Sequence, residues 1–443
     1  MRMKKPIAII GGGVAGLTAA NFLKKQGIPF ILFESGKKIA GLATSFKDEE
    51  GFSYDFGAHF ITNRLAKAIG VSCECRLVKQ YGEAVWLKGK SYHYPFGLIK
   101  IPRMSVSWIT CQLKSIGKKQ IPHSSAEWFH QRYGSAVSDE IALPLLEAWS
   151  GSAAQNLSAA VCEGLFGGSI AKTFYLTTAA KLTGRAVACG YNREKPETPN
   201  VWHVYPNKGV STLCEKLAEG LEESIKLESP VREILVENEK VVAVSVHDKL
   251  YEVSAVISTA PANVLSKLVR GTKSLDYIAN FRYRPMVFIN MRFKGRSLLP
   301  DTVLWLPEKE FPFFRLTETP ISMPWLAPEG KTIITADIGC EKDDEIWTMD
   351  EEKLTELCLN SLMPVIPDAR ERFLGSSILK TPIAYPVFLS EYEQQRQYFE
   401  ESTNISNLLS VGRNGEFSHM FMEDVYWRTL KKVKSLVDQI YYN

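Results

Sequence analysis

The first part of the chain alternates between short apolar runs and polar or glycine-rich breaks. Residues 6–10 form one apolar run, and residues 30–33 form a second that ends at Glu34. Between them, residues 17–25 have the pattern of a helix, and Gly27 follows its end. Short apolar runs on either side of a helix are typical of buried parallel strands. The pattern therefore predicts a strand, a helix and a second strand.

Three glycines connect the first strand to the helix, with the spacing G-x-G-x-x-G. Gly11 permits the tight turn, Gly13 lets the backbone approach a pyrophosphate, and Gly16 lets the helix pack closely on the strand. The helix N-terminus then presents free N–H groups to phosphate oxygens. Glu34 is placed to accept hydrogen bonds from both hydroxyls of an adenosine ribose, and its charge would repel the 2′-phosphate of NADP. We expect a Rossmann-like, dinucleotide-binding βαβ unit.

A basic start followed by an uncharged stretch also occurs in signal peptides and membrane anchors. Residues 1–5 are basic, and residues 6–23 carry no charge. A membrane span does not need the three spaced glycines or a second strand that ends in an acid. We therefore favour the nucleotide-binding interpretation.

Later segments predict further elements and two large insertions. Alternation at residues 241–246 predicts a half-buried strand, strand-like patterns lie at 285–293 and 332–338, and helix-like patterns lie at 350–362 and from about 421 to 441. Aromatic and aliphatic residues between 128 and 149 have near-helical spacing. Residues 92–202 and 274–402 contain no nucleotide motif. We expect them to form a discontinuous α+β substrate domain, and residues 1–91, 203–273 and 403–443 to form the nucleotide-binding domain of an α/β protein.

Composition and charge exclude several classes of protein. The 443 residues are 45% hydrophobic and 23% charged, which is globular usage and not that of disordered or fibrous chains. The net charge is only +4, too small to indicate nucleic acid as the main partner. Eight scattered cysteines show no C-x-x-C or zinc-site spacing. We expect reduced, mostly buried thiols and a cytoplasmic, reducing compartment.

The segments after Glu34 resemble a known family. Residues 35–46, with Gly41, and the sequence Tyr-Asp-Phe-Gly-Ala-His at 54–59 resemble the flavin amine oxidase and protoporphyrinogen oxidase-like superfamily. Residues 205–213, 231–246, 255–261 and 408–417 resemble further blocks of that superfamily. The C-terminal Gly-Arg-x-Gly-x-Phe pattern is similar to the protoporphyrinogen oxidase-like branch and the UDP-galactopyranose mutase-like branch.

The resemblance implies FAD as the cofactor and a Rossmann-like FAD-binding domain. It also implies an FAD-dependent oxidoreductase that acts on a small organic molecule. The residues expected to hold the cofactor are Gly11, Gly13, Ala15, Gly16, Glu34, Ser35, Gly41, Leu42, Ala43, Gly57, Ala58, His59, Val231, Thr259, Ala260, Gly412, Arg413, Phe421 and Met422. The helix from about 421 would point its positive end at the flavin and stabilise negative charge there.

This chain departs from the family pattern at several positions. Ala40 stands where the motif after the ribose acid usually has its first glycine, and Leu42 stands where many members carry arginine. Arg413 replaces a common aspartate after Gly412. We expect Arg413 to contact the cofactor, either at its phosphates or at negative charge on the flavin, with an ordinary ion pair as the alternative.

Two residues are candidates for catalysis. His59 follows Gly57 and Ala58, as in the flavin-proximal segment of the mutase-like branch, and the alternative is a hydrogen-bonded structural imidazole. Arg315 is a candidate for binding carboxylate or phosphate groups, as are Arg282 and Arg284, although surface arginines are the plainer interpretation for any one of them. Histidine spacing indicates no catalytic metal.

Three functions fit these observations. The first is oxidation of an organic substrate by hydride transfer to flavin N5, similar to protoporphyrinogen or amine oxidation. The second is a flavin-dependent sugar-nucleotide rearrangement with no net redox change, and the third is a flavin-binding protein without catalysis, which the departures at Ala40 and Leu42 leave open. We favour the first.

The segment at residues 94–109 is amphipathic and offers a further alternative. It is rich in apolar residues and interrupted by Lys100 and Arg103. Such a segment is able to contact a membrane surface peripherally, but a helix of the substrate domain is the plainer interpretation and the one we favour.

Overall fold

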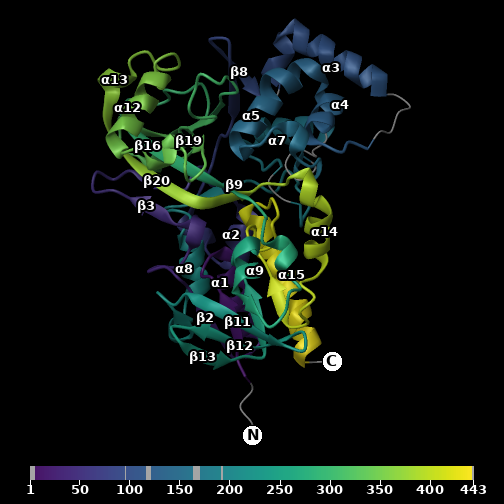
Figure 1. The fold of residues 1–443 in the computed structure, drawn as a ribbon. Coiled ribbons are helices and arrows are strands. Elements are labelled where there is room, and N and C mark those ends of the chain that lie inside the picture. Colours follow the sequence, from purple (N-terminus) through teal and green to yellow (C-terminus); the bar gives the residue numbers. More distant parts are fainter. Residues whose placement is uncertain (1–4, 95, 116–120, 163–169, 191–192, 442–443) are drawn as a thin grey trace.

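The computed structural model describes residues 5–94, 96–115, 121–162, 170–190 and 193–441. Figure 1 shows two lobes, with both ends of the chain at the lower one. The chain crosses between the lobes several times. Strands from residues 7 to 10 and from 408 to 410 therefore share the lower lobe, while the intervening segments build the upper one.

A five-stranded parallel sheet forms the centre of the lower lobe. Its order is β10-β2-β1-β14-β21, with bounds β10 (Ile225–Lys226), β2 (Phe30–Phe33), β1 (Ile7–Ile10), β14 (Ala255–Ser258) and β21 (Leu408–Ser410). Every residue of β1 and β14 is buried. Both neighbours of β1 run parallel to it, so the ends of the three strands meet at one edge.

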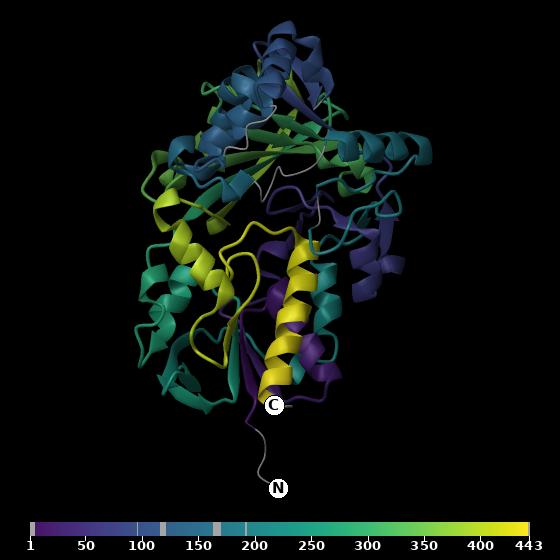
Figure 2. The ribbon, with the colours of Figure 1, turned by 90° about the vertical axis from the view of Figure 1, so that its right-hand side faces the viewer.

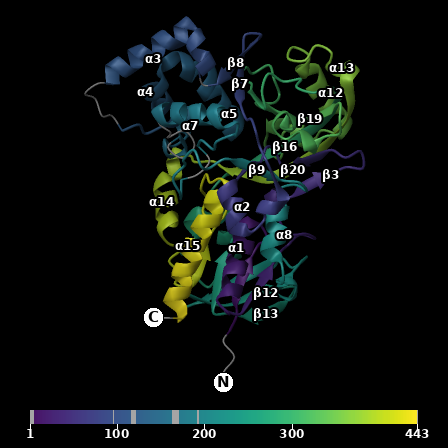
Figure 3. The ribbon, with the colours of Figure 1, turned by 180° about the vertical axis from the view of Figure 1, so that it is seen from behind.

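The two faces of β1 pack against different layers, because successive side chains of a strand point in opposite directions. Ile7 and Ile9 join a core with α1 (Val14–Lys25), α8 (Thr212–Ala218) and α15 (Met422–Tyr441). Ala8 and Ile10 join a second core with the four-stranded sheet β13-β12-β11-β15. Seen from behind, α15 runs beside α1 (Figure 3). The bounds of the second sheet are β11 (Val231–Glu237), β12 (Lys240–Val246), β13 (Lys249–Glu252) and β15 (Val269–Arg270).

A mixed seven-stranded sheet forms the centre of the upper lobe. Its order is β20-β16-β19-β18-β17-β7-β8, with bounds β20 (Phe373–Pro386), β16 (Tyr283–Lys294), β19 (Lys331–Gly339), β18 (Arg315–Thr317), β17 (Val303–Trp305), β7 (Glu83–Leu87) and β8 (Lys90–Tyr94). α12 (Glu351–Leu362) and α13 (Ala369–Arg372) cover one face. Phe56 packs at the other face against Phe288, with ring centroids 6.2 Å apart. That face is therefore turned toward the lower lobe.

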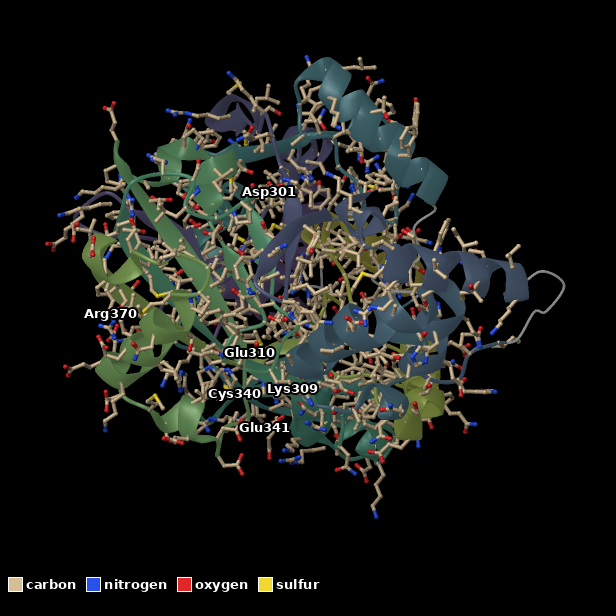
Figure 4. The ribbon with its side chains drawn as sticks, turned by 90° about the horizontal axis from the view of Figure 1, so that it is seen from above. Asp301, Lys309, Glu310, Cys340, Glu341 and Arg370 are labelled. Atoms are coloured by element: carbon tan, nitrogen blue, oxygen red, sulfur yellow. The ribbon has the colours of Figure 1, made fainter. Side chains whose placement is uncertain are left out.

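Helices cover the β7–β8 end of the upper lobe. They are α3 (Pro102–Ser115), α4 (Ser125–Val137), α5 (Leu143–Ser150) and α7 (Ile170–Thr183), with short helical turns η3 (Phe96–Lys100), η4 (Ser138–Ala142) and η5 (Ala154–Asn156). Seen from above, Asp301 before β17 and Glu341 after β19 lie on opposite sides of this lobe (Figure 4).

The remaining elements are short and lie within one of the lobes or between them. The small strands are β3 (Ser45–Lys47), β4 (Ser53–Asp55), β5 (Ile61–Thr62), β6 (Cys75–Leu77) and β9 (His203–Pro206). The remaining helices are α2 (Asn63–Ile69), α9 (Ala262–Leu268), α10 (Thr319–Ser322), α11 (Glu345–Thr348) and α14 (Glu393–Glu401). The remaining helical turns are η1 (Gly41–Ala43), η2 (Ser72–Glu74), η6 (Glu222–Ser224), η7 (Asp276–Ile278), η8 (Pro324–Leu326) and η9 (Ser390–Tyr392).

The α/β prediction with a parallel, Rossmann-like sheet is confirmed. The strand expected at 241–246 lies within β12, and the helix expected at 350–362 is α12, which Asp350 caps. The division into a cofactor domain and a substrate domain stays a prediction. Its first boundary, at residue 91, falls inside the β7–β8 hairpin, and β7 pairs with β17, so sheet membership places residues 83–94 in the upper lobe.

We expect the stability of the fold to depend on pH through His203 in β9. The side chain is buried against Phe60 and Tyr81, and burial lowers its pKa to about 4. His203 therefore takes up a proton near pH 6.5 in the unfolded chain but only near pH 4 in the folded chain. The free energy of unfolding falls as the pH drops from 6.5 to 4, because protonation favours the unfolded chain. The contribution amounts to about 3 kcal/mol.

Chemical unfolding of His203→Gln between pH 7 and pH 4 tests this, since the variant should lose stability less steeply than the wild type. His123→Gln, at an exposed position, is the matched control. Equal slopes for the wild type and the His203 variant would contradict the assignment.

Candidate functional site

The turn between β1 and α1 leaves no room for side chains at two glycines. Gly11 has φ +99°, and a Cβ there would lie 2.1 Å from Thr259 Oγ1. A Cβ on Gly16 would lie 1.9 Å from the carbonyl oxygen of Gly11. Thr259 is itself fixed, because its hydroxyl donates to the carbonyl of Ile10 at 2.8 Å. The fingerprint glycines are thus required by close contacts of this chain.

Gly13 differs from the other two glycines because its Cβ position is open. The nearest protein atom would be Ala40 O at 3.8 Å, which is an ordinary contact. Gly13 caps α1 without a side-chain hydrogen bond, and the first turn of α1 contains no acid. The positive end of a 12-residue helix is therefore exposed to a space suited to an anion.

The acid at the end of β2 lies directly beside this turn. Glu34 Oε2 accepts the N–H of Gly12 at 2.6 Å, and Oε1 accepts the N–H of Gly36 at 2.7 Å. Ser35 follows and donates to Glu34 at 3.3 Å. Oε1 thus accepts from both Gly36 and Ser35, whereas Oε2 accepts only from Gly12 and keeps a further lone pair for a ribose hydroxyl. Val231 begins β11 shortly after Ser229, whose N–H donates to the carbonyl of Glu34 at 2.8 Å.

The segment after Glu34 returns to the same turn. The N–H of Ala40 donates to Gly12 O at 2.8 Å, and Ala40 has φ 94°, the left-handed conformation that favours glycine. A Cβ on Gly41 would lie 3.7 Å from Gly13 Cα. Leu42 is half-buried and Ala43 is buried in η1. Ala40 therefore adopts a conformation that a glycine would adopt at lower cost.

The C-terminal motif packs against the first turn of α1 and, with the glycine turn, Glu34 and Ala40, forms what we call the cofactor cradle. Gly412 has φ +89°, and a Cβ there would lie 2.9 Å from the Cβ of Ala15 in α1. Ala260 lies beside Thr259 at the end of β14. Phe421 and Met422 are half-buried at the start of α15.

The first turn of α15 contains two buried acids, Glu423 and Asp424. Arg64 binds Glu423 at 2.6 Å, and the backbone N–H groups of Arg193 and Glu194 donate to Asp424. The helix end is thus already compensated by protein groups.

His59 lies where the lower lobe meets the upper sheet. Its Nδ1 is 3.5 Å from Asp55 Oδ2, and its side chain is 19% exposed. Asp55 also accepts Tyr205 Oη at 2.5 Å and Ser45 Oγ at 2.6 Å, so the carboxylate is held in place. Burial, followed by the charge of Asp55, raises the pKa of Tyr205, which keeps the phenol a donor.

Gly57 and Ala58 bring this loop against the second catalytic candidate. A Cβ on Gly57 would lie 3.3 Å from Arg315 Nη2. Arg315 donates from Nη2 to Asp337 in the neighbouring strand β19, and Asp337 is fully buried. Burial opposes the charge of Arg315, but Asp337 raises its pKa, so the guanidinium stays charged. The structure thus brings His59 and Arg315 to one region.

Arg413 points toward the upper lobe. Its Nε donates to Met420 O at 2.9 Å, and its guanidinium carbon lies 5.6 Å from the ring centroid of Tyr385 in β20. Burial lowers the pKa of Arg413, and it forms no ion pair with any described residue. Tyr385 is close enough to raise the pKa of Arg315 also. We call Arg315, Tyr385 and Arg413 the cationic wall.

Aromatic residues extend the cationic wall. The ring centroid of Trp149 lies 5.2 Å from that of Tyr385 and 4.9 Å from that of His419. Phe388 lies 4.6 Å from His419. Burial and the charge of Arg413 hold the pKa of His419 well below its ordinary value, so the imidazole is neutral.

The other two candidate arginines are held elsewhere. Arg282 and Arg284 both pair with Glu341, at 3.1 and 2.5 Å. Arg284 is buried, so the surface interpretation is wrong for this residue.

Sequence reasoning missed Asp337, Tyr385, Trp149 and His419. Asp337 gave one usable signal, because it is an acid inside an otherwise apolar strand. Tyr385, Trp149 and His419 gave no such signal in the sequence, since they lie in separate elements that only the fold brings together.

The residues present fit FAD. The open Cβ position at Gly13, the uncapped helix end and the acid beside the turn match a pyrophosphate and a ribose. Gly41 lies against Gly13 of this turn, and Gly412 lies against Ala15 at the start of α1. The described part of the chain contains no group of three or more acidic, histidine or cysteine side chains suited to a metal ion. None of its helices is long and apolar enough to cross a membrane.

We expect Gly13→Ala to weaken FAD binding without unfolding the protein. The added methyl group meets only an ordinary contact from the chain, and alanine is a poorer N-cap than glycine, so the melting temperature should fall by only a few degrees. The same methyl group occupies the space expected for the pyrophosphate, so the affinity for FAD should fall at least about tenfold.

Absorbance of purified protein near roughly 450 nm, together with titration of the apoprotein, gives the cofactor content and affinity. Gly16→Ala is the contrasting variant, because its Cβ overlaps the carbonyl of Gly11 and should destabilise the fold itself. Full FAD content in Gly13→Ala would show that the cofactor does not approach this turn.

We expect Ala40→Gly to stabilise the protein by about 0.5 kcal/mol. The left-handed backbone costs an alanine about 1–2 kcal/mol, and the greater flexibility of glycine in the unfolded chain offsets part of that gain. Chemical unfolding measures the difference. Ala43→Gly, three residues later in an ordinary conformation, should instead destabilise the protein, and stabilisation by both variants would rule out the explanation.

Comparisons with known proteins agree with this geometry. The family model described as flavin containing amine oxidoreductase matches residues 14–412. Coproporphyrinogen III oxidase of Bacillus subtilis is 21% identical over 415 residues, covering 82% of this chain and 83% of that protein. Amine oxidase [flavin-containing] B of Mus musculus is 25% identical over 284 residues, covering 59% of this chain and 51% of that protein.

The fold also matches a solved structure over nearly its whole length. Reduced UDP-galactopyranose mutase superposes with a TM-score of 0.80 at 18% identity, covering 99% of this chain and 96% of that one. The glycine turn, the acid beside it and the match of the family model over most of the chain lead to one conclusion. This chain belongs to the flavin-containing amine oxidoreductase family and is an FAD-dependent oxidoreductase.

Proposed function

We propose that this oxidoreductase acts on an organic substrate that bears carboxylate groups, of the porphyrinogen class. The observation that carries the proposal is Arg413, a half-buried cation without an ion pair among the described residues. Removing an ion from water costs several kcal/mol unless an opposite charge compensates it. An anionic group of a ligand beside the cationic wall would supply that compensation.

The same charges disfavour a protonated amine. Arg315 is largely neutralised by Asp337, but Arg413 leaves an excess positive charge beside Tyr385. A second cation placed here would be repelled, whereas guanidinium groups bind carboxylates with directed hydrogen bonds.

The extent of the sequence matches supports this choice of substrate. The relative named coproporphyrinogen III oxidase aligns along more than four fifths of both chains, whereas the one named amine oxidase B aligns along about half of its own length. A coproporphyrinogen is a largely apolar macrocycle of four pyrrole rings with carboxylate side chains. Trp149, Tyr385 and Phe388 offer aromatic surface for such a ring beside the cationic wall.

We assign roles to the residues of the chain as follows. Gly11, Gly13, Gly16, Glu34 and Gly412 hold the cofactor, together with the other residues named for it in the sequence except His59 and Arg413, which we assign to the substrate. Bound FAD supplies the acceptor for the substrate's hydride. Residues 1–91, 203–273 and 403–443 contribute these groups.

We propose that His59 acts as a general base that accepts a proton from the substrate. Nδ1 lies 3.5 Å from Asp55 Oδ2 without a hydrogen bond, and the charge of the carboxylate favours a proton on Nδ1. Nε2 is then free to accept a proton that the substrate loses. Tyr205 and Ser45 orient Asp55 and so keep its negative charge beside the imidazole. Arg315 orients a carboxylate of the substrate.

A second candidate is rearrangement of a sugar nucleotide without net redox change. The specific observation in its favour is that two guanidinium groups near one tyrosine also suit a diphosphate. For the compartment, we propose the cytoplasm, which the eight free thiols support. Four of them are buried, fewer than the sequence led us to expect.

Anaerobic titration of the FAD-loaded protein distinguishes these functions. We expect coproporphyrinogen III to bleach the oxidised flavin band near roughly 450 nm, and benzylamine not to. Turnover of UDP-galactopyranose only after reduction with dithionite would favour the rearrangement instead. No bleaching by any porphyrinogen would contradict the proposal.

Arg413→Met should raise the substrate concentration needed for half-maximal bleaching by about tenfold or more, since a charge-assisted contact is lost. FAD content, measured on the same sample, shows whether the arginine serves the substrate or the cofactor. Arg270→Met is the matched control, because that arginine pairs with Glu233 at the exposed surface of the lower lobe.

A further inference from the structure

Helix α3 presents its apolar side to the outside of the molecule. Val106, Ile109 and Leu113 are 62%, 51% and 65% exposed. Their spacing of three and four residues places them on one face of the helix. Scattered exposed aliphatic residues are common, but a continuous stripe of large ones indicates an interaction surface.

The face of α3 that packs on the protein is, in contrast, mostly small and polar. Cys111 lies against α4, with its sulfur 3.1 Å from the carbonyl oxygens of His130 and Gln131. The hydroxyl of Ser107 accepts the N–H of Ala136 at 3.1 Å. Met104 is the one buried side chain of α3 among those described. The fold therefore orients this helix opposite to an ordinary surface helix, whose apolar side faces the core.

The apolar surface continues onto neighbouring elements. Phe96 in η3 and Phe174 in α7 are both exposed, and their ring centroids are 6.1 Å apart. Ile99 and Tyr175 are 64% and 59% exposed beside them in sequence. These elements lie in the upper lobe, at the end of the molecule away from both termini (Figures 1 and 2).

The charges on the same elements have one sign. From Ala84 to Ser115 the sequence contains five Lys and Arg residues and no acid, and from Ile170 to Gly190 it contains three and no acid. The whole chain, by comparison, has 53 basic and 49 acidic residues. Arg103 and Lys88 pair with Glu140, and Lys172 pairs with Glu197.

Lys100, Lys114 and Lys181 form no ion pair with a described residue. We define the apolar–basic face as these three lysines with Phe96, Ile99, Val106, Ile109, Leu113, Phe174 and Tyr175.

We propose that the apolar–basic face docks onto an anionic lipid surface. Exposed aliphatic and aromatic side chains enter the boundary between headgroups and acyl chains, while lysines beside them bind lipid phosphates. A second copy of this chain is a poorer occupant, because a two-fold contact would bring the unpaired lysines of both copies into one interface without acids of this face to compensate them. The proposal revises the sequence interpretation of residues 94–109, which favoured a helix serving only the substrate domain.

Cosedimentation of the FAD-loaded protein with lipid vesicles tests the proposal. We expect binding to vesicles that contain phosphatidylglycerol, weaker binding to pure phosphatidylcholine, and partial release by high salt. The triple variant Val106→Ser, Ile109→Ser and Leu113→Ser should lower the partition coefficient about tenfold or more. The double variant Lys100→Glu and Lys114→Glu should abolish the preference for phosphatidylglycerol.

Leu250→Ser is the matched control and should bind like the wild type. Leu250 is 59% exposed on β13, in the opposite lobe. Retained flavin absorbance shows that each variant is folded. Failure of the wild type to bind phosphatidylglycerol vesicles, or equal binding by the triple variant, would overturn the proposal. A wild-type dimer in gel filtration that the triple variant converts to a monomer, without vesicle binding, would assign the face to a second copy instead.

Discussion

The approach of α1 to the end of β1 is the constraint on which the rest of the site depends. The backbone of Gly16 lies so close to the carbonyl of Gly11 that even a methyl group would overlap it. This contact fixes where the helix begins, and three distant segments are positioned against that beginning. Ala40 bonds to Gly12, Thr259 packs on Gly11, and Gly412 packs on Ala15. A small change in the helix position would displace all of them.

The upper lobe adds charge to this rigid frame in two different ways. Arg315 and Asp337 are neighbours across β18 and β19, and their mutual attraction offsets part of the cost of burying them, although burial still raises the pKa of Asp337. Arg413 stands on the lower lobe with no such compensation. The paired arginine is therefore part of a stable sheet face, whereas the unpaired one gives the space between the lobes its excess charge. His59 lies beside this boundary with its own carboxylate.

Local patterns were sufficient to predict the nucleotide-binding unit. The glycine spacing and the alternation in β12 each involve fewer than twenty consecutive residues, so both can be recognised in the sequence without knowledge of the fold. Pairing of β7 with β17 was not predictable, because it joins positions 220 residues apart, as Val303 and Glu83 show. The direction of the Arg413 side chain depends on Tyr385 in another lobe, and no short motif contains that information. The stripe on α3 was visible as an amphipathic pattern, but sequence alone does not tell which side faces the protein.

The sheet order also has a consequence for how the protein is made. β21 and Gly412 belong to the cofactor cradle, yet they follow β1 by about 400 residues. At roughly 5–20 residues per second, a ribosome takes roughly 20 to 80 seconds to add them. Helices and hairpins form within microseconds, so the nascent β1 and β2 wait in an incomplete sheet for nearly the whole of translation. The free edge of that sheet is the part of the newborn chain most exposed to chaperones and to aggregation.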